Sequence, residues 1–404
     1  MRTTTTRLRL GLADLLTGRY PTVPVDVRPG ESLEVSLAYE RGAAVVDLGC
    51  EGPAGWRGWS GAARDRFAIT PTAATPGYLP GELEPGTWHV VLGLHRLPVE
   101  PVEITVTTTV GGSPAVEREP AAPAPTDAVR GSERGLPSEP GLTWYAGDFH
   151  AHTVHSDGDH SIAGLAHRAA ANGLDFLAVT DHNTVSHHPL LPAAGAPYGI
   201  TLLPGQEVTT DRGHANALGD IGFVDFRRPA EEWVRTVTER GGILSVNHPL
   251  EGDWAWQHPL RTLPQALELW HIGWFRDLTA TAMWALWQRW APGTVALGGS
   301  DFHNTELRYE PGTPTTWVQA ADRSPAAILA GVAAGRTALT QTPRSPALLS
   351  VDGELIAVDA TGTVLRDIHG HGRPVTGARQ RLPRMTEGVH RLETPDRQLV
   401  AICP

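Results

Sequence analysis

The stretch DFHAHTVHSDG at residues 148–158, followed by TDHN at residues 180–183, indicates both the fold and the chemistry of this chain. Eight of the 18 histidines fall between His150 and His188. An even distribution would place about two there, and each buried imidazole needs partners for its ring nitrogens. Imidazole is a common protein ligand of zinc, iron and manganese, so the clustering indicates a metal site.

The first motif predicts a strand followed by a loop. His150 and His152 lie two positions apart, so on a strand their side chains project from the same face. Asp157 follows in the next turn, and a helix expected at 161–172 leads to the strand LDFLAVT at 174–180. A β-loop-α-β unit with polar residues at strand ends is typical of α/β active sites.

The same pattern recurs along the chain, because each later polar cluster also follows an apolar strand. These clusters are Gln206-Glu207 with His214 seven residues on, Asn247-His248, and Asp301-Phe302-His303. Five strands would therefore aim His, Asp or Glu side chains at one mouth. This arrangement predicts the site of a (β/α) barrel.

The flanking regions predict further domains. Apolar and polar residues alternate from Val25 to Val110, with Pro and Gly between the runs, which predicts an antiparallel β-sandwich of seven or eight strands within residues 1–112. We expect Trp56, Trp59 and Trp88 in its core. Residues 113–142 are a Pro/Ala-rich linker, and the barrel should occupy 143–345. Alternation returns in 346–404, predicting a small β appendage.

The ordered motifs HxHTxxSDG, TDHN, GxE, HP and SDFH resemble the PHP (polymerase and histidinol phosphatase) metallohydrolases. EVTT at 207–210 followed by Gly213-His214 is similar to the CehA/McbA-like branch. The resemblance covers roughly residues 145–345. It implies a distorted (β/α)7 PHP barrel, TIM-like in layout, with a trinuclear site of two to three divalent ions (Mn, Fe or Zn).

The resemblance also implies which residues bind metal. In chain order the implied ligands are His150, His152, Asp157, His182, Glu207, His214, His248, Asp301 and His303. One ion would be held by His150, His152, Glu207 and Asp301. Glu207 would bridge to a second ion at His214 and His248, where Asn247 is a competing donor. The third ion would bind Asp157, His182 and His303.

By the same resemblance the chain is a phosphoesterase, which hydrolyses a small phosphomonoester, phosphodiester or nucleotide with a hydroxide held between two ions. Glu207, Asp301 and His303 are its implied catalytic residues. One alternative is hydrolysis of a carbamate, ester or amide at the same site. Another is a non-catalytic binding module built on the β-sandwich, but the complete set of metal ligands argues against this alternative.

A phosphoester substrate needs positive charge beyond the metals. No Lys occurs in the chain, so arginine must supply it, and Arg212, Arg276 and Arg308 are the candidates near the predicted mouth. His155 and Asn247 are further candidates for substrate contact. Asp148 and Asp181 should orient ligand imidazoles without binding metal themselves.

Composition excludes several other classes of protein. The absence of Lys excludes Schiff-base chemistry and a P-loop, and two distant cysteines provide no thiolate zinc site. A net charge of -11 argues against a nucleic-acid polymer or an anionic membrane as partner. With no leader-like or membrane-spanning segment evident, we expect a cytoplasmic enzyme acting on a small molecule, and homo-oligomerisation is left open.

Overall fold

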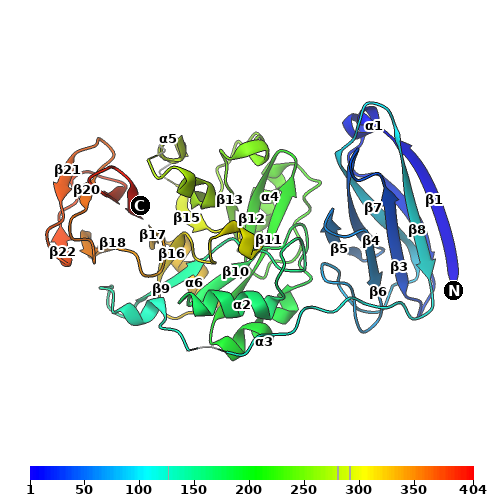
Figure 1. The fold of residues 1–404 in the computed structure, drawn as a ribbon, viewed down its shortest axis with the longest axis horizontal. Helices are drawn as coiled ribbons and strands as arrows, with labels where there is room; N and C mark the ends of the chain where they lie inside the picture. The colour runs from blue at the N-terminus through cyan, green and yellow to red at the C-terminus, as the bar shows by residue number, and fades with distance from the viewer. Residues whose placement is uncertain (126, 280–281, 291–292) are drawn as a thin grey trace. The chain divides into compact units, whose positions relative to one another are not determined.

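The protein is represented by a computed structural model, which describes residues 1–125, 127–279, 282–290 and 293–404. It contains two compact units (Figure 1). Unit one comprises residues 1–121, 152–161 and 181–189. Unit two comprises residues 122–151, 162–180 and 190–404.

Unit one contains two four-stranded antiparallel sheets, drawn in blue to cyan in Figure 1. The first sheet has the order β1 (Arg2–Leu10), β8 (Val102–Val110), β3 (Leu33–Tyr39) and β6 (Arg66–Ile69). The second has the order β2 (Thr22–Val27), β7 (Gly86–Arg96), β4 (Val45–Gly52) and β5 (Gly55–Gly61). A short helix, α1 (Leu12–Thr17), connects β1 to β2.

Both sheets contribute to one hydrophobic core. In β2, the alternate residues Val23, Val25 and Val27 are buried while the residues between them are exposed. The rings of Phe67 and Tyr78 stack with centroids 4.0 Å apart in the same core. Two sheets that share a core agree with the predicted β-sandwich. Trp59 and Trp88 are buried as expected, whereas Trp56 is only partly buried.

Unit two is built on one mixed sheet of thirteen strands. Its first strands in spatial order are β15 (Val295–Gly299), β14 (Ala266–His271), β13 (Ile243–Val246), β12 (Gly213–Leu218), β11 (Thr201–Thr210), β10 (Phe176–Val179) and β9 (Thr143–Asp148). The remaining strands are β16 (Thr315–Ala320), β17 (Thr337–Thr340), β24 (Leu399–Cys403), β23 (His390–Glu393), β20 (Val364–Arg366) and β21 (Gly372–Pro374). The sheet contains parallel pairs such as β9–β10 and β13–β14 together with antiparallel ones such as β12–β13.

Helices connect the strands of this sheet. They are α2 (Ile162–Ala171), α3 (Leu191–Gly195), α4 (Ala230–Glu239), α5 (Ala282–Trp290) and α6 (Pro325–Ala333). The α2 helix buries Leu165, Ala166 and Ala169 on one face, and Gly173 follows it with a φ of 90°, a backbone conformation that favours glycine. The chain also forms short 3-10 helices, which are η1 (Gly131–Arg134), η2 (His188–Leu190), η3 (Ala196–Tyr198), η4 (Gly252–Trp254), η5 (Ile272–Arg276) and η6 (Thr305–Leu307). No helix in the described ranges is long and apolar enough to span a membrane.

The residues after β15 approach those after β9. The backbone N–H of Asp301 donates to the carbonyl of His150 at 3.0 Å, and Ala151 and Phe302 form a single parallel bridge. Within the described residues this is an isolated bridge and β15 and β9 are not ladder neighbours. The closed (β/α)7 barrel therefore stays a prediction.

The C-terminal region does not form one separate sheet. Strands β24, β23, β20 and β21 extend the main sheet beyond β17. A second, three-stranded sheet contains β18 (Ala347–Val351), β19 (Glu354–Val358) and β22 (Arg379–Leu382). The residues predicted as a β appendage are thus divided between two sheets.

Candidate metal centre

The first group of metal-ligand donors lies in unit two, where four strands each supply one side chain. His150 follows β9, Glu207 lies within β11, His248 follows β13 and Asp301 follows β15. The Nε2 atom of His150 is 3.2 Å from Oε1 of Glu207 and 3.1 Å from Oδ1 of Asp301. Donor atoms of His150, His248 and Asp301 all lie within 4.8 Å of one another. This spacing allows them to share one divalent ion.

Glu207 is the centre of this group. Its strand does not end at Gly205, as the sequence predicts, but continues to Thr210 and pairs with β12. His214 lies diagonally across that pairing, and its Nδ1 is 3.1 Å from Oε1 of Glu207. Nε2 of His248 lies 3.5 Å from the same oxygen. One carboxylate oxygen therefore faces two imidazoles besides His150.

Asn247 also reaches Glu207, but its amide is already used. Its Nδ2 donates to Oε1 of Glu207 at 2.8 Å, and its Oδ1 accepts the backbone N–H of Asn216 at 3.3 Å. Both ends of this side chain therefore serve contacts within the protein. The donor atom of His248 lies in the cluster with those of His150 and Asp301, and the choice between His248 and Asn247 as ligand stays a prediction.

The sequence analysis missed Glu268, which lies on β14 and is 3% exposed. Its Oε1 is 3.0 Å from Nδ1 of His150, and its Oε2 accepts the backbone N–H of His248 at 2.6 Å. A carboxylate on Nδ1 holds the imidazole in the tautomer whose Nε2 can bind metal. The available signal was an acidic residue inside the otherwise apolar strand ALELW.

Electrostatics show that this group favours a positive charge. Burial alone lowers the pKa of His150, but Asp301, Glu207 and Glu268 outweigh it and raise that pKa well above its ordinary value. The pKa of His248 is also raised, since the same three carboxylates overcome the effect of burial. A proton or a metal cation would supply that charge, so the donor set fits a divalent ion.

Two residues of the group have unusual backbone conformations. His248 has a φ of 25° and Asp301 a φ of 52°, in the left-handed region that non-glycine residues rarely adopt. Such strain is concentrated at functional sites, where the surrounding structure maintains it. Both residues come directly after short buried strands, where the chain turns out of the sheet.

Asp148 connects the chain after β9 with the chain after β15, next to the donors of the first group. It accepts backbone N–H groups from His150 at 3.1 Å, Ser300 at 3.0 Å and Gly312 at 2.7 Å. Burial raises the pKa of Asp148 to about 6, although the hydrogen bonds from these residues oppose the shift. Asp148 thus holds the backbone that carries the donors, and its predicted role of orienting a ligand imidazole stays a prediction.

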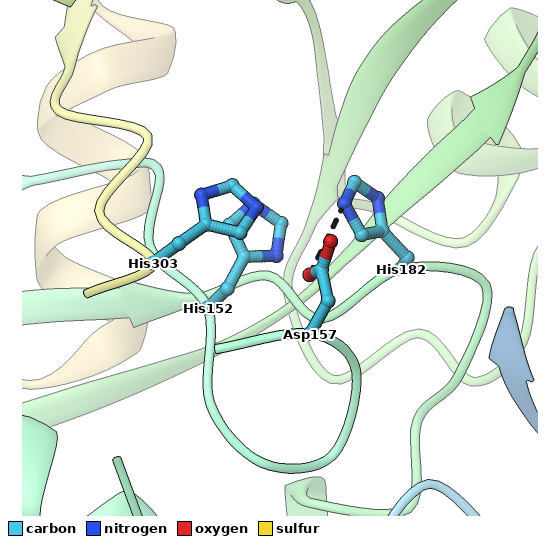
Figure 2. A group of neighbouring side chains, drawn as sticks. All are labelled: His152, Asp157, His182 and His303. Carbon is cyan, nitrogen blue, oxygen red and sulfur yellow. Dashed lines mark ion pairs between the residues drawn. The ribbon is translucent and has the colours of Figure 1, made fainter. Parts of the chain in front are cut away.

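The second group lies on the two loops that belong to unit one. Figure 2 draws His152, Asp157 and His182, together with His303 of unit two. Nε2 of His182 is 3.5 Å from Oδ1 of Asp157, and the rings of His152 and His182 stack with centroids 4.4 Å apart. Donor atoms of these three residues lie within 4.8 Å of one another, which suits a second ion.

Asp181 organises the loop that carries His152. Its carboxylate accepts the backbone N–H of Thr153 at 2.8 Å, the Thr153 hydroxyl at 2.6 Å and the Ser156 hydroxyl at 2.7 Å. The Ser156 oxygen lies 3.4 Å from Nδ1 of His152. Burial raises the pKa of Asp181, but the nearby His187, His155 and His152 lower it by more. Asp181 therefore holds the loop of His152, and its predicted role of orienting a ligand imidazole stays a prediction.

The remaining predicted residues lie in varied surroundings. His155 is buried, and its ring nitrogens contact Ser186 at 2.7 Å and Glu119 at 3.1 Å. Arg212 is exposed and donates to the carbonyl of Gln257 at 2.9 Å. Arg308 is exposed at the end of η6, and the side chain of Arg276 lies outside the described residues. The roles of all these residues in substrate binding stay predictions.

His303 carries a contact that fixes its orientation. Its Nδ1 is 2.8 Å from the carbonyl oxygen of Asp301, two residues earlier. A carbonyl accepts but cannot donate, so Nδ1 carries the proton and Nε2 is the nitrogen able to bind a cation.

One family model matches part of the chain. The family model of the PHP domain matches residues 148–249. The PHP match begins at Asp148 and includes the loops of the second group, Glu207 and His248. It ends before Asp301 and His303.

Individual proteins resemble parts of the chain. A 5'-3' exoribonuclease from Haemophilus influenzae is 39% identical over 64 residues, which are 16% of this chain and 23% of that protein. The chain thus spans less than a quarter of the length of this curated relative.

Two solved structures also resemble the chain. One is a Bacteroides vulgatus two-domain protein described as containing a predicted PHP-like metal-dependent phosphoesterase; it has 18% identity, a TM-score of 0.40 and coverage of 66% of this chain and 97% of that one. An amidohydrolase from Chromobacterium violaceum has 20% identity, a TM-score of 0.30 and coverage of 39% and 87% respectively.

Proposed function

We propose that the protein is a metal-dependent phosphoesterase that hydrolyses a small phosphomonoester, phosphodiester or nucleotide. The observation that carries this proposal is the convergence of the His150 imidazole with the carboxylates of Glu207 and Asp301, within 3.2 Å of its Nε2. With Nδ1 occupied by Glu268, the lone pair of Nε2 faces two negative groups. This arrangement is favourable when a positive charge, from a proton or a metal cation, lies among them, and a divalent ion supplies it without occupying Nε2 with hydrogen.

We further propose that both donor groups belong to one centre of two to three Mn, Fe or Zn ions in a PHP barrel of the CehA/McbA-like branch. The continuity of the chain supports this, because one residue separates His150 from His152, and one separates Asp301 from His303. His150, Glu207, His214, His248 and Asp301 would hold one part of the centre. His152, Asp157, His182 and His303 would hold the other. This assigns His152 to the ion of Asp157 and His182, whose donor atoms lie within 4.8 Å of its own, and not to the ion of His150, as the resemblance implied.

Divalent ions bound there would act as Lewis acids and lower the pKa of coordinated water. The residues of the chain prepare that environment. Glu268 keeps the proton of His150 on Nδ1, and Asp301 does the same for His303 through its carbonyl oxygen. Glu207 collects three imidazoles around one carboxylate, while Asp148 and Asp181 hold the surrounding backbone. Each donor is thus oriented before substrate arrives.

The test is metal analysis combined with three substrates. Protein purified without chelator is analysed by ICP-MS and assayed with p-nitrophenyl phosphate, bis-p-nitrophenyl phosphate and 1-naphthyl N-methylcarbamate. We expect two to three equivalents of Mn, Fe or Zn together with phosphoester turnover. Both should be lost in a His150→Ala/His152→Ala double variant.

Other results would change the conclusion. Bound metal with turnover of the carbamate alone would replace the phosphoesterase with a carbamate hydrolase at the same site. A protein that binds no metal even after reconstitution, or a double variant that keeps its metal and its turnover, would contradict the proposal.

A further inference from the structure

Arg64, in the sandwich of unit one, contacts the loop that carries Asp157. Its Nη1 donates to the carbonyl of Ser156 at 3.0 Å, and its Nη2 donates to the carbonyl of Val154 at 2.7 Å. An ion pair with Glu117 at 3.1 Å fixes the guanidinium, and the side chain is only 14% exposed. Ser156 immediately precedes Asp157, so this contact fixes the backbone next to a proposed ligand.

Trp56, also in the sandwich, makes the corresponding contact with the other loop. Its indole Nε1 donates to the carbonyl of Asn183 at 3.0 Å. Asn183 immediately follows His182 and has a left-handed φ of 52°, a conformation that needs support from its surroundings. Each loop therefore receives a sandwich hydrogen bond at the residue adjacent to its ligand.

Gly77 of the sandwich touches both loops. Its N–H donates to Nδ1 of His155 at 3.3 Å, and its carbonyl accepts the hydroxyl of Thr184 at 2.7 Å. A Cβ at this position would lie 2.7 Å from the carbonyl oxygen of His155, closer than real contacts allow. Only glycine permits this approach, so the two loops are fixed against one turn of the sandwich.

We propose that Arg64 and Trp56 are positioning residues for metal binding, through which the sandwich fixes the ligand loops at Asp157 and His182. This inference rests on the proposed function, because it concerns the ion held by His152, Asp157 and His182. Groups that orient ligands typically change metal affinity by about 10- to 100-fold when removed. The ion held by His150, Glu207 and Asp301 has none of these contacts and should be retained.

The experiment measures how strongly each ion is held in the full-length protein. Wild type, Arg64→Ala, Arg64→Lys and Trp56→Phe are dialysed against increasing chelator concentrations, and the remaining metal is counted by ICP-MS. Arg41→Ala is the matched control, because Arg41 is an exposed arginine paired with Asp65 at 3.5 Å. Thermal unfolding of each variant is recorded in parallel.

We expect Arg64→Ala to lose one equivalent at a chelator concentration at least tenfold lower than wild type, while the other equivalents are retained. Arg64→Lys should fall between the two, since an ammonium keeps the charge but lacks the guanidinium fork. Trp56→Phe keeps an aromatic side chain but replaces the indole with a smaller phenyl ring and removes the N–H, so it should show the same selective loss even if Arg64→Ala fails to fold. Arg41→Ala should match wild type.

Two outcomes would overturn the inference alone. In one, Trp56→Phe and the Arg64 variants hold every equivalent as tightly as wild type. In the other, they lose all equivalents together. A wild-type protein that takes up no metal would instead contradict the proposed function, and this inference with it.

Discussion

The two donor groups differ in what holds them. In the first, Glu207 is fully buried on a strand, and the donors are oriented by other carboxylates, above all Glu268. In the second, the side chain of Asp157 is 45% exposed on a loop, and the adjacent backbone is held by a tryptophan and an arginine of the sandwich. Donors on strands are placed by the pairing of the sheet, whereas donors on loops depend on hydrogen bonds from elsewhere in the chain.

This difference predicts two kinds of sensitivity. Substitutions in the first group remove buried charge and should impair the whole centre. Substitutions around the second group should release one ion and leave the rest. The following predictions test that contrast.

Glu207→Gln should have the largest effect. The substitution removes the charge that faces His150, His214 and His248, so at least two equivalents of metal should be lost. Turnover of p-nitrophenyl phosphate should fall about a thousandfold, equivalent to roughly 4 kcal/mol. Glu239→Gln, on the surface of α4, is the control. Unchanged metal content in Glu207→Gln would remove the basis for the first group.

Glu268→Gln should weaken the same group by a smaller amount. The amide keeps the size of the side chain but can present its NH₂ to Nδ1 of His150, which favours the wrong tautomer. Metal affinity should fall about 10- to 100-fold. Titration with Mn²⁺ by calorimetry measures this effect. If Glu268→Gln weakens only the equivalent that Asp181→Asn also weakens, Glu268 supports the second group, and our distinction between the groups is wrong.

Asp181→Asn should act on the second group alone. The substitution disturbs the contacts with Thr153 and Ser156 that position the loop of His152. We expect about a tenfold loss of affinity for one equivalent, with the remaining equivalents unchanged. Comparing its metal titration with that of Glu268→Gln gives a direct contrast. Identical titration curves for the two variants would show that the groups do not respond independently.

Asp47→Asn should give the smallest effect, through the stability of the sandwich. Burial raises the pKa of Asp47 to about 7, although the charges of His182 and Arg19 oppose the shift. The folded state favours the protonated carboxyl of Asp47. The contribution of this group to the free energy of unfolding is therefore greatest at acid pH and falls as pH rises from about 4 to about 7. Relative to Asp47→Asn, wild type should lose about 1 kcal/mol of unfolding free energy between pH 5 and pH 8. This value is reduced because the Asp47 side chain is partly exposed.

Urea unfolding followed by tryptophan fluorescence checks this difference at both pH values. Mn²⁺ should reduce the pH-dependent difference in stability between wild type and Asp47→Asn, since positive charge near His182 favours the ionised carboxylate of Asp47. A wild-type protein that gains stability over the same pH interval, relative to the variant, would refute the assignment.

Much of the site follows from the sequence because its donors come directly after apolar strands. His150, His248 and Asp301 were recognisable in this way, and β9, β13 and β15 end just before them. The extent of β11 was not recognisable. Pro204 and Gly205 suggest that a strand stops there, but pairing with β10 on one side and β12 on the other carries the strand through.

The supporting contacts were also beyond sequence reasoning. Glu268 lies 118 residues from His150, and Arg64 lies 92 residues from Ser156. Nothing in the local sequence distinguishes Arg64 from Arg66, which is exposed at the start of β6. Only the folded chain brings such residues to their partners.

The sheet order also affects how the protein is made. β24 comprises residues 399–403, yet it lies inside the thirteen-stranded sheet, between β17 and β23. While the ribosome is still adding the preceding residues, β17 has an open edge with no strand to pair it. An open edge of this kind attracts other chains. The main sheet therefore stays open to pairing with other chains at β17 until residues 399–403 have left the ribosome.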